Sequence, residues 1–211
     1  MGEETAEPQS ADLMVDLIIS LDGYASAEGW PGWWGLEGPE YLAWLDQEGQ
    51  KDYTLLMGAN TYRLMSGMSE EAAAADSGFS SEEEASLTGL AAVPKVVFSS
   101  TLQEPLAWPN TELVAGDAVE AVREMKRTRT GTLSTLGSLS LTRSLLTAGL
   151  VDRYRLVVFP VITGKTGSEW IYDGYPDVAL EMVDSRTFDG RLQLLEYRPT
   201  LLNGPPARGP R

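Results

Sequence analysis

Short apolar runs alternate with segments of helical spacing along most of this chain. Six of these runs are bounded by glycine, proline or polar residues and have the lengths of strands. They are Leu13–Leu21, Tyr53–Met57, Lys95–Ser99, Glu112–Val114, Leu133–Leu136 and Tyr154–Val161. The alternation predicts strand–helix–strand units, and therefore an α/β fold in which helices flank a mainly parallel sheet.

Helix start and stop signals lie between these runs. Asp117, followed three residues later by Glu120, forms a capping-box pattern. Ser138 is placed to cap the next helix, and Gly149 to end it. A further helix is predicted for Pro39–Gln47, with proline in its first turn.

The C-terminal part of the chain has a different pattern. Extended segments at Leu180–Phe188 and Arg191–Arg198 are joined by Asp189-Gly190, a strong two-residue hairpin signal. We therefore expect an antiparallel hairpin to close one edge of the sheet. A single domain is predicted for residues 12–199, with disordered tails at 1–11 and 200–211 and a mobile, acidic, alanine-rich loop at 69–92.

Four turns rich in small residues follow the predicted parallel strands. They are Asp22-Gly23, Gly58, Ser99-Ser100 and Gly137-Ser138. In open parallel sheets, ligands bind beyond the carboxyl ends of the strands, and the free N–H groups of a helix N-terminus favour an anion. The turns predict a site for a phosphate-bearing cofactor, although turns of this kind also serve helix–strand packing alone.

Composition restricts the chemistry that such a site can use. The 211 residues include neither cysteine nor histidine, which excludes thiolate nucleophiles, disulfides and histidine-based catalysis, and we expect no metal site. The net charge of −15 argues against a nucleic-acid partner. No apolar run has the length of a membrane span and the N-terminus is acidic, so we expect a cytoplasmic protein without membrane contact.

Short motifs in a fixed order carry a resemblance to a known family. They are ISLDGYAS (19–26), LLMGANTY (55–62), KVVFSST (95–101), LGSLSL (136–141) and GLVDRYRLVVFPVITG (149–164). Their order and spacing resemble the dihydrofolate reductase-like superfamily, in particular the reductase domain of the bifunctional riboflavin-biosynthesis deaminase/reductase. The resemblance extends over about residues 13–198 and implies a cytoplasmic, often homodimeric reductase that uses NADPH, with NADH as the alternative cofactor.

The resemblance also implies roles for individual residues. Those expected at the cofactor are Gly58, Thr61, Ser99, Ser100, Thr101, Gly137 and Ser138. Ser20, Asp22 and Gly23 would border the nicotinamide and the substrate. The candidate catalytic carboxylates are Asp22 and Glu40; Glu40 lies near the position where dihydrofolate reductases have a buried carboxylate at a helix start. A glutamate in a first helical turn is also favourable without any catalytic role.

The chain departs from the family pattern at several positions. Ala59 replaces an arginine that can hold the 2′-phosphate, and Ser138 replaces the second glycine of a doublet. On the substrate side, Asp16 and Leu136 match positions of a lysine and an acidic residue, and only Arg63 is available as a phosphate ligand near MGANTYRLM. These departures argue against a ribosyl-phosphate pyrimidine as substrate.

An aromatic insertion follows the SLDG turn. Trp30, Trp33 and Trp34 are candidate substrate-binding residues that would stack on a flat ring or close over it, with a dimer contact as the alternative. Trp170 and Tyr172 would approach the same pocket from the other side. The first hypothesis is a reductase that transfers hydride to a small, flat, heterocyclic or conjugated carbonyl or imine substrate. The alternatives are a non-catalytic nucleotide-binding protein and a dimeric scaffold.

Overall fold

A computed structural model describes residues 10–29, 34–74, 79 and 81–205 of the chain. Its main sheet has eight strands in the order β5-β4-β3-β6-β1-β7-β10-β9. Six of them are parallel: β1 (Asp12–Ser20), β3 (Tyr53–Gly58), β4 (Lys95–Phe98), β5 (Thr111–Val114), β6 (Thr132–Thr135) and β7 (Arg153–Phe159). The predicted mainly parallel sheet is therefore confirmed.

The last two strands form the predicted antiparallel hairpin. Strands β9 (Val178–Phe188) and β10 (Leu192–Leu201) pair with each other, and β10 pairs with β7. Asp189 and Gly190 have φ values of 51° and 65°, the left-handed pair that a two-residue hairpin turn of this twist requires. A second, two-stranded sheet pairs β2 (Tyr24–Ala27) with β8 (Gly167–Trp170).

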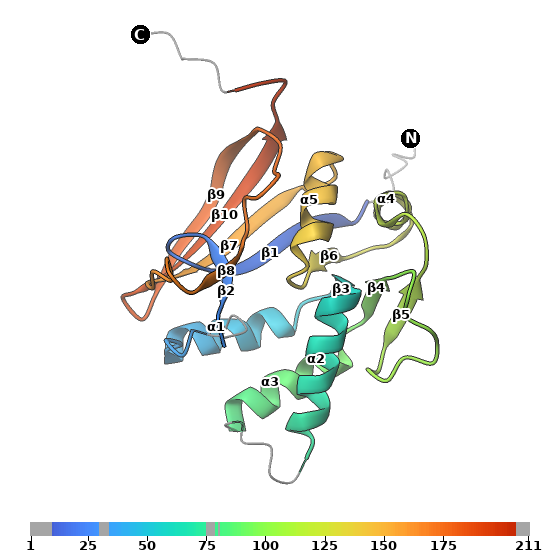
Figure 1. Cartoon of the computed structure of the whole chain (residues 1–211), viewed down its shortest axis with the longest axis horizontal. Coiled ribbons are helices and arrows are strands. Elements are labelled where there is room, and N and C mark those ends of the chain that lie inside the picture. Colours follow the sequence, from blue (N-terminus) through green and yellow to red (C-terminus); the bar gives the residue numbers. More distant parts are fainter. Residues whose placement is uncertain (1–9, 30–33, 75–78, 80, 206–211) are drawn as a thin grey trace, which may run out of the picture.

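Helices cover both faces of the main sheet (Figure 1). On one face, α4 (Ala118–Thr128) and α5 (Leu139–Thr147) pack against alternate residues of β1, among them Leu13, Val15 and Leu17. On the other face lie α1 (Pro39–Gly49), α2 (Ala59–Ala72) and α3 (Ser81–Ala92). This division follows from the period of two along a strand, which sends successive side chains to opposite faces.

The helix boundaries agree with the sequence signals at α4 and α5, with one exception. Asp117 caps α4 by accepting hydrogen bonds from the amides of Val119 and Glu120 at 2.8 and 3.2 Å. Gly149 follows α5 with a φ of 66°. Ser138, in contrast, makes no capping hydrogen bond to its own helix.

The predicted loop at 69–92 is wrong for most of its length. Helix α2 continues to Ala72, and α3 occupies Ser81–Ala92. Alanine has the highest helix propensity, and acidic residues are favourable at a helix N-terminus, so this composition stabilises helix. The buried Lys95 ammonium completes α3 by donating to the carbonyls of Leu90, Ala91 and Val93 at its end.

Both tails are also shorter than predicted. Ala11 is buried, and its amide donates to the carbonyl of Lys126. At the other end, β10 continues to Leu201, and the amide of Leu202 donates to the carbonyl of Asp177. Both positions therefore belong to the folded domain.

Candidate functional site

The ladder between β1 and β6 stops before β1 ends, and the region beyond its last pair, at the carboxyl ends of the two strands, is termed the crevice. Their ladder ends at Met14 and Ser134, whereas β1 continues beside β7 as far as Ser20. Past the ladder, the amide of Asp16 donates to the Thr135 hydroxyl instead of a backbone carbonyl. From β1 the chain runs past β6 to β3, and from β6 it later runs back past β1 to β7, so the connections change direction at these two strands. Open α/β sheets bind ligands where the connections change direction in this way.

Two helices begin at this crevice from neighbouring strands. Helix α2 starts directly after β3, and α5 starts just after β6. In the part of the chain that the structure describes, neither helix has an N-cap residue whose side chain makes a capping hydrogen bond. Because the first amides of a helix have no partner within it, the two helices direct free N–H groups and the positive ends of their dipoles at one region. This arrangement favours an anion such as a diphosphate.

Ser138 joins the two turns. Its hydroxyl accepts a hydrogen bond from the Gly58 amide at 2.8 Å and donates to the Thr61 hydroxyl at 2.7 Å. Its φ of 58° follows a φ of 56° at Gly137, so a non-glycine residue is held in the left-handed region at the crevice. The Gly58 amide is thus hydrogen-bonded within the protein. The amides of the first residues of α2 and α5, which follow Gly58 and Ser138, are the donors available to a ligand.

A second polar group lies after β4. Ser99 organises the turn by accepting hydrogen bonds from the amides of Thr101 and Leu102, both at 3.1 Å. The exposed Arg63 guanidinium, on the second turn of α2, lies 3.3 Å from Asn60 Oδ1 and 3.4 Å from the Thr101 hydroxyl. Among the described residues Arg63 has no carboxylate partner. It therefore offers a guanidinium beside the Thr101 hydroxyl, which lies 3.3 Å from the Ser99 hydroxyl.

Ser20 and Asp22 fix the turn between β1 and β2 by hydrogen bonds. The buried Ser20 hydroxyl donates to Asp22 Oδ1 at 2.6 Å and accepts from the Tyr24 amide. Asp22 also accepts hydrogen bonds from the amides of Thr163 and Gly164 at 3.1 and 2.8 Å. The Ser20 hydrogen bond lowers the pKa of Asp22 below its usual value. Burial opposes part of this effect, and the hydrogen bonds from the two amides add to the lowering. Asp22 is thus suited to hold the turn as a carboxylate, and the geometry does not support it as a proton donor.

The Glu40 side chain is hydrogen-bonded to the turn between β9 and β10. Its carboxylate accepts a hydrogen bond from the Asp189 amide at 2.6 Å. In return, the Asp189 carboxylate accepts from the amides of Glu40 and Tyr41 at 3.0 and 3.2 Å. This reciprocal capping gives Glu40 a structural role that explains its place in the first turn of α1, and the geometry does not support the predicted catalytic role.

Tyr41 and the loop before α1 bring polar groups to the sheet face beside the crevice. Tyr41 is fully buried, with its ring packed edge-on against Phe159 at 5.7 Å. Burial raises the pKa of its hydroxyl, and the carboxylates of Asp16 and Glu37 add to the rise, so the hydroxyl stays protonated. Trp34, one of the predicted substrate residues, packs on the same apolar cluster. Trp30 and Trp33 lie outside the described residues.

An ion-pair network lies on the same face. Arg155, 5% exposed, donates to both carboxylate oxygens of Asp16 at 3.1 and 2.6 Å and to Glu48 at 2.7 Å. Burial alone would raise the pKa of Glu48, but hydrogen bonds from Lys51, Arg155 and Tyr53 outweigh it and lower that pKa to about 2. Arg155 therefore fixes the Asp16 carboxylate at the crevice. Sequence reasoning singled out Asp16 but missed Arg155, and the arginine within the apolar run RYRLVVF was the available signal.

Trp170 and Tyr172 flank the Asp22-Gly23 turn from the β8 side. A Cβ atom placed at Gly23 would lie 3.1 Å from both side chains, so they contact the backbone of the turn. They are 46% and 40% exposed and stack edge to face at 5.6 Å. They therefore contact the Asp22-Gly23 turn, and their predicted place at the ligand pocket stays a prediction.

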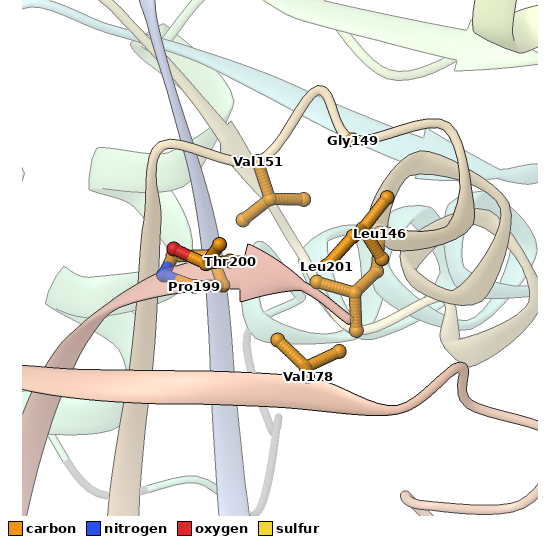
Figure 2. Close-up of a pocket in the computed structure, with 7 residues that line it drawn as sticks. All are labelled: Leu146, Gly149, Val151, Val178, Pro199, Thr200 and Leu201. Carbon is orange, nitrogen blue, oxygen red and sulfur yellow. The ribbon is translucent and has the colours of Figure 1, made fainter. Parts of the chain in front are cut away.

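A groove of about 380 Å³ lies at the other edge of the sheet. Figure 2 shows its lining, which comes from the end of α5, the start of β7 and the far end of the hairpin: Leu146, Gly149, Val151, Val178, Pro199, Thr200 and Leu201. Because β7 leads from this edge to the crevice at its carboxyl end, the groove is separate from the candidate site. Within the described part of the chain, no cluster of acidic side chains has the arrangement of a metal site, and no helix is long and apolar enough to span a membrane.

Comparison with known proteins agrees with this geometry. The family model of the RibD C-terminal domain matches residues 11–194. The chain belongs to this family. Its relative YyaP of Bacillus subtilis, an uncharacterized protein, is 27% identical over 187 residues, which are 88% of this chain and 93% of YyaP.

Two solved structures share the fold. A putative riboflavin biosynthesis protein from Shewanella sp. PV-4 has a TM-score of 0.63 at 18% identity and covers 90% of this chain and 99% of its own. Dihydrofolate reductase of Enterococcus faecalis, in complex with NADP(H) and RAB-propyl, has a TM-score of 0.55 at 13% identity and covers 89% of this chain and 96% of its own. The fold is therefore dihydrofolate reductase-like, as the motif order predicts.

Proposed function

We propose that this chain is an NADPH-dependent reductase that transfers a hydride to a small, flat, heterocyclic or conjugated carbonyl or imine substrate. The observation that carries the proposal is the convergence of two N-termini without side-chain caps, those of α2 and α5, on the crevice between β1 and β6. Membership in the RibD C-terminal domain family supports the reductase class.

The residues at the crevice fit a dinucleotide. The first amides of α2 and α5, together with Thr61 and Gly137, would hold the diphosphate. Arg63 and the hydroxyls of Ser99, Ser100 and Thr101 would hold a 2′-phosphate, with Arg63 serving in place of the arginine that Ala59 replaces. When bound, NADPH supplies a hydride to the carbon of a C=N or C=O bond and leaves as NADP⁺. The bond's nitrogen or oxygen then takes its proton from water, because Asp22 and Glu40 are engaged elsewhere.

Binding of two nucleotides tests the cofactor assignment. We expect the chain to bind 2′,5′-ADP more tightly than 5′-AMP in a calorimetric titration, because the two differ only in the 2′-phosphate that Arg63 would bind. Arg63→Gln removes one charge-assisted interaction, of about 1.5–3 kcal/mol, and should weaken 2′,5′-ADP binding by about tenfold to a hundredfold with little effect on 5′-AMP. Arg191→Gln, at another exposed arginine on the hairpin turn, is the matched control.

The outcomes separate the two parts of the proposal. If neither nucleotide binds, the crevice is not a nucleotide site and the proposed function is wrong. If both bind equally well to the wild type and to Arg63→Gln, the cofactor site stands but its preference for NADPH over NADH does not.

The engagement of Asp22 and Glu40 also favours a second candidate function, a protein that binds the nucleotide without catalysis. Hydride transfer distinguishes the two candidates. NADPH labelled with tritium at the nicotinamide C4 is incubated with a cell extract with and without the chain; transfer of the label to a small molecule that the extract alone does not label excludes the non-catalytic protein.

A further inference from the structure

A short chain of hydrogen bonds with a fixed direction links the starts of α2 and α5. The Gly58 amide donates to the Ser138 hydroxyl, and the Ser138 hydroxyl donates to the Thr61 hydroxyl. A hydroxyl group carries a single hydrogen, so Ser138 has none left to donate and Thr61 keeps its own. Among the residues that the structure describes, no group accepts the Thr61 hydrogen. The chain of hydrogen bonds therefore ends in a free donor.

Thr61 lies where the two helices begin. It is the third residue of α2 and so belongs to the turn whose amides have no partner within the helix. A Cβ atom placed at Gly137 would lie 3.7 Å from Thr61 Oγ1, so the Thr61 hydroxyl borders the backbone just before α5. Gly137 is exposed, and Thr61 is half-buried. A ligand held by the first amides of both helices would therefore also meet the Thr61 hydroxyl.

The direction of the hydrogen bonds determines which ligand group Thr61 can bind. Because Thr61 accepts from Ser138, its remaining hydrogen favours a ligand atom that is an acceptor. Each hydrogen bond in such a chain polarises the next, so the last hydroxyl is a stronger donor than an isolated one. The positive ends of the two helix dipoles favour negative charge at the same place. An anionic oxygen meets both conditions.

The contacts of the Ser138 side chain explain why a residue with a Cβ atom occupies this position. Its φ of 58° and ψ of 63° lie in the left-handed region, which glycine adopts without the steric cost that other residues bear. The Ser138 side chain does not cap α5, the helix that it precedes. Both of its hydrogen bonds go to the start of α2. The function of the side chain therefore concerns α2.

We propose that Ser138 is a positioning residue of the cofactor site, which orients the Thr61 hydroxyl as a hydrogen-bond donor to the diphosphate. Thr61 contacts the cofactor, and Ser138 acts through Thr61. A side chain before α5 thus sets a donor on α2, in addition to the backbone amides of the two helices. This inference rests on the proposed function, because the diphosphate is that of the NADPH proposed there.

Binding of NADP⁺ and of adenosine 2′-monophosphate to the full chain tests this role. Only NADP⁺ contains the diphosphate, so adenosine 2′-monophosphate reports on the rest of the site. Ser138→Ala should weaken NADP⁺ binding about tenfold in calorimetry and change adenosine 2′-monophosphate binding less than about twofold. Phosphorus NMR of bound NADP⁺ should show shifted diphosphate resonances and an unshifted 2′-phosphate resonance. Ser144→Ala, which removes an exposed hydroxyl from α5, is the matched control and should change neither affinity.

Further variants distinguish positioning from a purely structural role. Ser138→Gly removes the same hydroxyl but relieves the left-handed strain, so it should melt above Ser138→Ala while losing as much NADP⁺ affinity. It also carries the test if Ser138→Ala does not fold. Thr61→Val removes the final donor, and Ser138→Ala should then cause little further loss of NADP⁺ binding. Thr61→Ser keeps the hydroxyl and should bind NADP⁺ nearly as the wild type does.

The inference is overturned if Ser138→Ala and Ser138→Gly bind NADP⁺ as the wild type does. It is also overturned if affinity follows the melting temperature across these two variants, or if Ser138→Ala costs the same affinity with Thr61 and with valine at that position. Each of these results leaves the cofactor site standing and rejects only the role of Ser138. If the wild type binds neither NADP⁺ nor adenosine 2′-monophosphate, the proposed function itself is wrong.

Discussion

The carboxylate of Asp22 ties the β1–β2 turn to the loop after β7 by accepting from Ser20, Thr163 and Gly164. Because folding lowers its pKa, Asp22 contributes stability that is fully present above the usual value of 3.8 and is lost as pH falls through the lower folded value. Asp22→Asn removes this contribution. We expect the variant to melt below the wild type at neutral pH, and the gap to narrow below pH 3.8. Thermal unfolding followed by circular dichroism across this range measures it.

Asp46→Asn is the control for this prediction, because Asp46 is exposed and pairs only with Gln50 among the described side chains. A gap for Asp22→Asn that stays constant to the lowest pH at which both proteins fold would contradict the assigned hydrogen bonds. Sequence reasoning found Asp22 from its place in a glycine turn. It could not find the function of the side chain there, because Thr163 and Gly164 lie more than a hundred residues away along the chain.

At the scale of elements, local signals were sufficient where a few neighbouring residues determine the geometry. The Asp117 cap, the Gly149 helix end and the Asp189-Gly190 turn are of this kind. The segment at 69–92 was misjudged because its acidic, alanine-rich composition was interpreted as solvated chain, although alanine favours helix and the Lys95 ammonium binds carbonyls at the end of α3. The candidate site shows the same division. The turns at Gly58 and Gly137 were predictable, whereas the Ser138 bridge and the Asp16–Arg155 pair depend on how strands meet.

The contact between α1 and the hairpin gives a prediction at the scale of elements. Asp189 both caps α1 and occupies a turn position with a φ of 51°. Asp189→Gly keeps the turn and loses only the cap, so we expect it to destabilise the protein by about 1 kcal/mol. Asp189→Ala loses the cap and adds about 1–2 kcal/mol of left-handed strain. In urea unfolding, Asp189→Ala should therefore have a lower free energy of unfolding than Asp189→Gly. The free energy of unfolding of Asp189→Gly should be close to that of Asp117→Ala, which removes a local cap only.

Equal losses for Asp189→Ala and Asp189→Gly would show that the turn tolerates a Cβ atom and would contradict the assigned strain. Gly38 provides an independent check of the same contact. A Cβ atom there would lie 2.1 Å from the Asp189 carboxylate carbon, so Gly38→Ala must displace the cap. We expect its loss of stability to be largely absent when Asp189 is already glycine, because the group it displaces is then gone.

At the scale of the whole molecule, net charge sets how stability responds to salt. The chain carries −15 at pH 7, and this excess of like charge destabilises the compact state. Several described ion pairs join two exposed side chains, whose individual contributions are small. Raising sodium chloride from about 0.02 M to about 0.5 M shortens the screening length to a few ångströms and should weaken the repulsion more than the pairs. We therefore expect the melting temperature at pH 7 to rise with salt. Near the isoelectric point of about 4.3 the same addition should have little effect, and a fall at pH 7 would mean that attractive surface pairs outweigh the net repulsion.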